Sequence, residues 1–187
     1  MIEADVRLFR GRLEVRHLKT VGPVRIYWDR WRLCGPRAAI LELETLLATA
    51  APTTRLMLDL KGFDPRLGRA VRAALDRQPD ARVTLCARHW THLAAFEGRP
   101  GVELVRSVGN RTQLRAVRRL LATRPLDGIS IHRRLLTPAV VAELRERVPL
   151  VLSWPVNTAE IGDLLVGWGV NGLISDRPQL LAARSAS

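Results

Sequence analysis

Three carboxylates in two apolar segments are the residues of this chain best suited to chemistry. Glu3 and Asp5 stand two residues apart near the N-terminus, and Asp59 lies in the apolar run that ends at Lys61. Residues two apart lie on the same face of a β-strand, so Glu3 shares a face with Asp5, and Asp59 shares a face with Lys61. Buried carboxylates are costly unless a cation or a proton offsets them. We therefore expect a metal site where these strands meet.

The elements that must position these residues alternate between strand-like and helix-like segments. The expected strands are residues 1–6, 56–61, 82–87, 102–108, 128–132, 150–154 and 172–175. The expected helices are residues 37–50, 67–77, 90–97, 111–123, 138–147 and 158–168, with another starting at Pro178. Such alternation predicts a parallel sheet with helical crossovers. No GxGxxG or GxxxxGK[ST] motif follows the first strand, which argues against nucleotide-binding folds.

Polar residues stand at the carboxyl ends of several expected strands, among them Lys61, His132 and Trp154. This is where (β/α)8 barrels build their sites, so the sequence predicts an α/β, TIM-barrel-like fold in one domain, residues 1–187. Seven strands are one short of eight, and the missing unit would be the first. Residues 13–17 form a hairpin return in which Leu13, Val15 and His17 share a face near the carboxylates. The following tract, with Tyr27, Trp28, Trp31 and Pro36, is too irregular to assign.

Composition limits the classes of partner. The net charge is +12, but the basic residues are nearly all arginines spread through every segment, without an aromatic platform, so we expect no nucleic-acid partner. The same positive field would attract a small phosphate-bearing substrate. Two distant cysteines, no signal-peptide pattern and no apolar run of ~20 residues predict a cytoplasmic protein without a transmembrane segment.

Five motifs in order along the chain resemble the glycerophosphodiester phosphodiesterase family of (β/α)8 barrels. They are E-A-D-V at 3–6, R-G-R-L-E-V-R-H at 10–17, L-D-L-K at 58–61, S-W-P-V-N at 153–157 and G-V-N-G-L-I-S-D-R-P at 169–178. The resemblance implies that Glu3, Asp5 and Asp59 are metal ligands, and that His17 is the catalytic acid or base. Three oxygen donors suit Mg²⁺ or Ca²⁺. Lys61 would hold the phosphate or support the ligand shell, and Trp154 would line the substrate pocket.

The chain also departs from the family pattern. The family's first strand, ending in His-Arg-Gly, has no counterpart here, Leu18 replaces an aspartate, and Asp59 replaces a glutamate. Either Met1 is an internal methionine and the start lies upstream, or the chain is a truncated and inactive relative. If the chain is complete, a barrel without one strand exposes unpaired edges, through which a homodimer could form.

Alternatives remain open for the individual residues. Glu3 and Asp5 could face solvent, Asp59 with Lys61 could be a structural ion pair, and His17 could be a surface histidine. We expect His132 as a further substrate contact, although Arg133 and Arg134 after it suggest solvation. His89 and His92 are expected on a helix surface, and Trp28 and Trp31 in core or lid packing. Alternative functions are a phospholipase C-like activity on a lipid head group, and an inactive barrel that binds a phosphorylated ligand or a protein.

Overall fold

The computed structural model describes residues 1–20, 27–29, 32–34, 39–51, 53–177 and 179–180. These residues form two compact units, Met1–Val102 and Glu103–Ser187. That the two units make up a single domain remains a prediction from the length of the chain.

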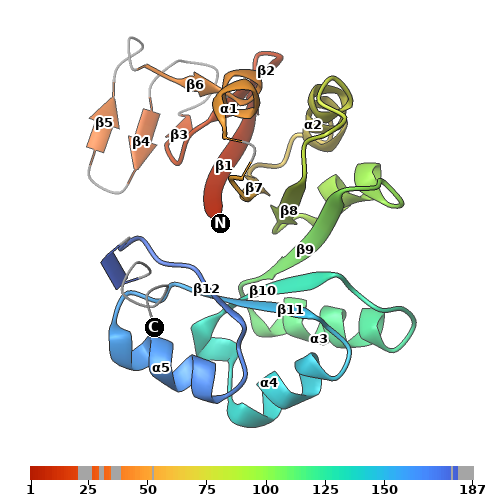
Figure 1. Cartoon of the computed structure of the whole chain (residues 1–187), viewed down its shortest axis with the longest axis vertical. Coiled ribbons are helices and arrows are strands. Elements are labelled where there is room, and N and C mark those ends of the chain that lie inside the picture. The colour runs from red at the N-terminus through yellow and green to blue at the C-terminus, as the bar shows by residue number, and fades with distance from the viewer. Residues whose placement is uncertain (21–26, 30–31, 35–38, 52, 178, 181–187) are drawn as a thin grey trace. The chain divides into compact units, whose positions relative to one another are not determined.

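The first unit is built on a mixed sheet (Figure 1). Its parallel strands are β1 (Ile2–Phe9), β7 (Leu56–Leu60) and β8 (Val83–Ala87), with β7 in the middle. Strand β2 (Arg12–Val15) pairs antiparallel with β1, and β6 (Leu41–Glu42) pairs antiparallel with β2. Every residue of β7 and β8 is buried, as expected for central parallel strands covered on both faces.

Helix α2 (Leu67–Asp76) covers this sheet through a regular apolar stripe. Its buried positions, Leu67, Val71, Ala74 and Leu75, recur with helical spacing and pack into the core. Gly68 on the same face allows the closest approach, because a Cβ there would lie only 2.4 Å from the carbonyl oxygen of His92. That oxygen belongs to η1 (Trp90–Phe96), a 3₁₀ helix where the sequence predicts a short helix.

The tract between the hairpin and residue 40 contains more strand than the sequence predicts. Strands β3 (Lys19–Thr20), β4 (Tyr27–Asp29) and β5 (Arg32–Cys34) form a small antiparallel sheet. Trp28 is 37% exposed with the Lys19 ammonium 4.9 Å from its ring, while Trp31 and Pro36 lie outside the described residues. The predicted helix 37–50 starts later, as α1 (Leu43–Thr49), because Leu41 and Glu42 enter strand β6.

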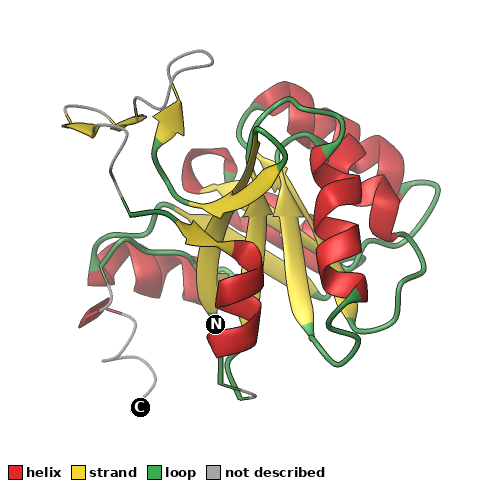
Figure 2. Ribbon diagram, turned by 90° about the horizontal axis from the view of Figure 1, so that it is seen from above, coloured by secondary structure: helices red, strands yellow, loops and turns green. Residues whose placement is uncertain are grey.

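The second unit contains a wholly parallel sheet. Its strands follow chain order: β9 (Val102–Val108), β10 (Gly128–His132), β11 (Leu150–Trp154) and β12 (Gly172–Leu173). Helices α3 (Arg111–Leu121), α4 (Pro138–Arg145) and α5 (Ala159–Gly167) lie along one face of it (Figure 1), and the 3₁₀ turn η2 (Arg133–Leu135) follows β10. Figure 2 shows the strands in yellow and the helices in red.

Local capping explains where the helices of this unit begin. The side chains of Asn110, Thr137 and Thr158 each accept a hydrogen bond from the backbone N–H three residues later. The predicted starts at Thr137-Pro138 and Thr158 are therefore confirmed. The last strand is two residues long rather than four, and Pro178, the predicted start of a terminal helix, lies outside the described residues.

All seven predicted strands are present, each at its predicted place in the chain. Among the described residues, no helix combines the length and the apolar character needed to cross a membrane.

Candidate metal centre

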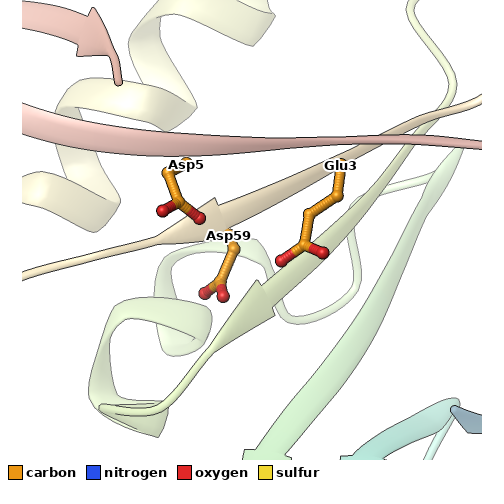
Figure 3. A group of neighbouring side chains, drawn as sticks. All are labelled: Glu3, Asp5 and Asp59. Atoms are coloured by element: carbon orange, nitrogen blue, oxygen red, sulfur yellow. The ribbon is translucent and has the colours of Figure 1, made fainter. Parts of the chain in front are cut away.

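Two neighbouring parallel strands bring the three predicted carboxylates together. In the β1–β7 ladder Asp5 stands opposite Asp59, and Glu3 stands opposite Met57. Since Glu3 and Asp5 are two residues apart on β1, both side chains lie on the face that Asp59 also occupies. One carboxylate oxygen from each residue lies within 4.8 Å of the others. Figure 3 shows the three carboxylates pointing to the same side of the two strands.

The burial of Asp59 indicates that this cluster is more than a polar strand face. Asp59 is only 5% exposed, and its Oδ1 is buried without a hydrogen-bond partner among the described residues. A buried, unsatisfied carboxylate oxygen is costly, and coordination of a cation would remove the cost. Three carboxylates from rigid strands supply the hard oxygen donors that Mg²⁺ and Ca²⁺ take as ligands. The residues present therefore fit a divalent cation.

The ammonium of Lys61 makes direct contact with the cluster. Its ammonium donates a hydrogen bond to Asp59 Oδ2 and lies 3.4 Å from Asp5 Oδ1. Burial lowers the pKa of Lys61, but the charges of Asp59 and Asp5 outweigh it and leave the pKa raised. Burial also raises the pKa of Asp5, against the opposing effect of Lys61. Three carboxylates and one ammonium leave a formal charge of −2, which a divalent cation would balance.

His17 lies beside the cluster at its exposed edge. Its Nε2 is 3.9 Å from Asp5 Oδ2, and its side chain is 71% exposed. The prediction that His17 shares a strand face near the carboxylates with Leu13 and Val15 is wrong. Val15 stands opposite Val6 in the ladder, so Leu13 and Val15 lie on the face away from Asp5. Strand β2 ends at Val15, and the chain after it carries His17 toward Asp5 outside the strand alternation.

The face toward Asp5 is instead occupied by charged residues that sequence reasoning missed. Glu14 and Arg16 are 1% and 7% exposed, and Arg16 Nε donates to Glu14 Oε2 at 2.6 Å. Arg7 stands opposite Glu14 on β1. Burial and the charge of Arg16 lower the pKa of Arg7, while Asp5 and Asp59 act in the opposite direction. Extending the strand alternation of residues 1–6 to Phe9 would have placed Arg7 on the carboxylate face.

The loop that carries Lys61 away from β7 is held by a buried histidine. His92 is 3% exposed, and its Nε2 lies 3.1 Å from the carbonyl oxygen of Gly62. The expectation that His92 lies on a helix surface is therefore wrong. His89, three residues earlier, packs against exposed Phe63 with ring centroids 4.3 Å apart and an interplanar angle of 51°.

The two other predicted substrate contacts lie together in the second unit. His132 and Trp154 end β10 and β11 and stand opposite each other in the parallel ladder. Their rings meet edge to face, with centroids 4.9 Å apart and an interplanar angle of 80°. His132 Nδ1 accepts a hydrogen bond from the backbone N–H of Arg134, which orients the imidazole.

Comparison with known proteins identifies the fold. No protein-family model and no curated protein sequence matches the chain. Solved structures do match. A phosphodiesterase from Oleispira antarctica, in complex with the product sn-glycerol-3-phosphate, is 16% identical, with a TM-score of 0.76 over 99% of this chain and 84% of that one. Glycerophosphodiester phosphodiesterases from Parabacteroides distasonis and Thermotoga maritima are 19% and 17% identical, with TM-scores of 0.73 and 0.70.

Coverage in the latter two structures is equally broad, at 98% and 97% of this chain and 84% and 83% of theirs. At these identities the similarity shows the fold. The chain has the mixed α/β, mainly parallel architecture of the glycerophosphodiester phosphodiesterase barrels, which confirms the predicted fold class and the predicted resemblance.

Proposed function

We propose that this chain is a metal-dependent phosphodiesterase that hydrolyses small glycerophosphodiesters to an alcohol and glycerol phosphate. The observation that carries the proposal is the orphaned Oδ1 of Asp59, inside a carboxylate cluster on a fold shared with enzymes of this activity. A bound cation would coordinate this unpaired oxygen and offset the repulsion between the carboxylates.

The roles of the residues follow from their chemistry. Glu3, Asp5 and Asp59 would hold the cation. When bound, a divalent cation polarises the phosphodiester and stabilises the charge that develops on its oxygens. Lys61, next to two of the ligands, would lend its positive charge to the phosphate once the cation has taken over the carboxylates. Trp154 and His132 would contact the organic part of the substrate.

His17 would move the proton. Hydrolysis forms a bond between phosphorus and an incoming oxygen, breaks the bond to the leaving alcohol, and consumes one water overall. The leaving alkoxide needs a proton, and an exposed imidazole beside Asp5 can deliver it and be reprotonated from solvent.

The test is the release of glycerol 3-phosphate from glycerophosphocholine and glycerophosphoethanolamine, with Mg²⁺ or Ca²⁺ and with chelator. The 187-residue chain would be compared with the chain extended to the nearest upstream in-frame start codon, and Asp5→Asn is the control. We expect activity that chelator abolishes and that Asp5→Asn lacks. Folded protein that binds the metal but releases no product would contradict the proposal in favour of a binding role.

A further inference from the structure

Arg7 follows Asp5 by two residues on strand β1 and lies on the same face of the sheet as the carboxylates. In the β1–β7 ladder Asp5 is opposite Asp59 and Val6 is opposite Leu60. The backbone N–H of Lys61 then donates to the carbonyl oxygen of Val6, which brings Lys61 level with Arg7. Strand alternation turns Arg7 to the side of Asp5. Two cations therefore stand beside the two carboxylates, toward the carboxyl end of β7, the end at which parallel strands present their sites.

The guanidinium of Arg7 has an unused donor. Its Nε is buried and has no hydrogen-bond partner among the described residues. Glu14 is opposite it in the ladder, and Glu14 Oε2 accepts a hydrogen bond from Arg16. A buried N–H without an acceptor is unfavourable, and a charged one more so. An anion bound between Arg7 and the carboxylate cluster would supply the missing acceptor.

The formal charges of this part of the sheet favour such an anion once a cation is bound. The four carboxylates are Glu3, Asp5, Asp59 and Glu14, and the three cations are Lys61, Arg7 and Arg16. Their sum is −1, so a divalent cation raises it to +1. A phosphodiester carries one negative charge and would bring the total to zero. Without Arg7 the cluster with its cation would already be neutral before the substrate binds.

We propose that Arg7 is a substrate-binding residue whose guanidinium donates hydrogen bonds to a non-bridging oxygen of the phosphoryl group. This inference rests on the proposed phosphodiesterase function and adds to it a specific anion contact. Arginine suits the task because its planar donors match phosphoryl oxygens in a fixed geometry. The order of binding follows: the phosphoryl group binds after the cation, because only then is the local charge positive.

The experiment measures two affinities by titration calorimetry on the whole chain: Mn²⁺ alone, and sn-glycerol 3-phosphate at saturating Mn²⁺. The test variant is Arg7→Gln. The matched control is Arg12→Gln, which removes the same charge from the same hairpin, at an exposed arginine paired with Glu42. Arg7→Lys is the second variant, since it keeps the charge and loses the fork of donors.

We expect Arg7→Gln to weaken glycerol 3-phosphate binding by about 10- to 100-fold, the range of a lost hydrogen bond to a charged group. Its Mn²⁺ affinity should stay the same or rise, because a positive charge near the carboxylates has been removed. Arg7→Lys should fall between wild type and Arg7→Gln, and Arg12→Gln should bind both ligands like wild type.

The outcomes that overturn the inference are separate from those that overturn the function. Failure of wild type to bind Mn²⁺ would refute the metal-dependent function itself. Normal Mn²⁺ binding with unchanged glycerol 3-phosphate affinity in Arg7→Gln would refute only the role of Arg7. A loss of both affinities in Arg7→Gln with full retention of both in Arg7→Lys would also refute it, by assigning Arg7 to the support of the fold.

Discussion

Asp5 and Asp59 stand directly opposite each other on adjacent parallel strands, and the ammonium of Lys61 lies against both. Like charges opposite each other on one sheet face are destabilising. The ammonium offsets part of that repulsion, but Asp59 Oδ1 still has no partner among the described residues. Binding of further positive charge beside Asp5 and Asp59 should therefore stabilise the folded chain.

Divalent cations should stabilise the folded chain through this cluster. At a metal concentration ~100 times the Kd the stabilisation is about 2.7 kcal/mol. For a chain of this size it corresponds to a rise in Tm of roughly 5–10 °C. Asp59→Asn should abolish the rise, because the amide removes a charged ligand without changing side-chain size. Thermal unfolding followed by circular dichroism, with Mg²⁺, Ca²⁺ or chelator, measures the rise in Tm of wild type and of Asp59→Asn.

Asp64→Asn is the matched control for that experiment, since it removes one carboxylate from the same unit outside the cluster. It should keep the full metal-dependent rise in Tm. Equal rises in wild type and Asp59→Asn would show that the stabilising cations bind elsewhere.

Replacement of Lys61 should separate metal binding from catalysis. The ammonium and the metal compete for Asp5 and Asp59, so Lys61→Met should bind Mn²⁺ at least as tightly as wild type. The affinity should rise by about 10-fold for every 1.4 kcal/mol of repulsion removed. Turnover of glycerophosphocholine should fall, because the phosphate loses a cation. Calorimetry and product release test the two effects, and weaker Mn²⁺ binding would argue that Lys61 supports the ligands instead.

His17→Gln should impair chemistry and leave the metal site intact. We expect kcat to fall by about 10²–10⁴-fold, the usual contribution of a positioned acid or base. The rise in Tm with Mg²⁺ should be unchanged, since His17 is largely exposed and lies at the edge of the cluster. The comparison needs kcat and the metal-induced Tm shift on the same preparation. An unchanged kcat would remove His17 from the mechanism.

The ionised carboxylate of Asp64 should contribute to the free energy of unfolding, and this contribution should be lost in acid. Hydrogen bonds from Arg66 to its carboxylate lower the pKa of Asp64 from 3.8 to about 2. The folded state then binds fewer protons than the unfolded state, so the contribution is complete above pH 3.8 and disappears as the pH falls through about 2. The difference in urea midpoint between wild type and Asp64→Asn should follow this course, whereas a constant difference would rule out the Arg66 effect.

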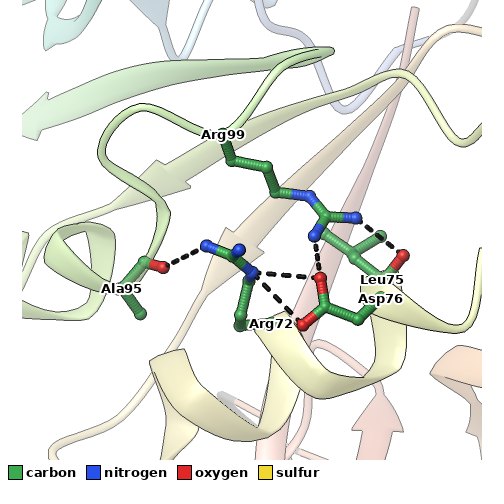
Figure 4. Close-up of polar contacts among 5 residues, drawn as sticks. All are labelled: Arg72, Leu75, Asp76, Ala95 and Arg99. Atoms are coloured by element: carbon green, nitrogen blue, oxygen red, sulfur yellow. Dashed lines mark hydrogen bonds and ion pairs between the residues drawn. The ribbon is translucent and has the colours of Figure 1, made fainter. Parts of the chain in front are cut away.

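Arg99 should be a stabilising residue through its bonds to helix α2. Its side chain is 10% exposed, donates to the carbonyl oxygen of Leu75 at 2.7 Å, and pairs with Asp76 (Figure 4). Arg72 bonds the same carboxylate and the carbonyl oxygen of Ala95, so the group joins α2 to the segment around η1 (Figure 4).

Arg99→Ala should cost roughly 1–3 kcal/mol, because it leaves the partly buried carbonyl oxygen of Leu75 without its donor. Arg66→Ala, at a side chain that is 73% exposed, is the control and should cost less. Urea unfolding of both variants at neutral pH compares them. Equal costs would mean that the Arg99 contacts add nothing beyond a surface ion pair.

The order of strands and helices was readable from the sequence because each element carries its own period. Alternating or continuous apolar runs predicted β7, β8, β10 and β11, and the threonines before α4 and α5 predicted where those helices begin. The same period placed Glu3 with Asp5 on one face, since alternation depends only on positions within one strand. The apolar run around Asp59 marked it as a third carboxylate inside a strand, and the motif resemblance implied that it is a metal ligand.

Only the tertiary structure decided which residues stand opposite one another. The register that sets Asp5 against Asp59, the turn that carries His17 to Asp5 after β2 has ended, and the burial of Glu14 with Arg16 all depend on pairing between separate strands. Register is chosen by inter-strand hydrogen bonds and by the packing of helices on the sheet, which a single strand's sequence does not contain. The sequence by itself determined the faces and the chemistry of the side chains. The tertiary structure determined their alignment, and with it the orphaned oxygen of Asp59 and the unused donor of Arg7.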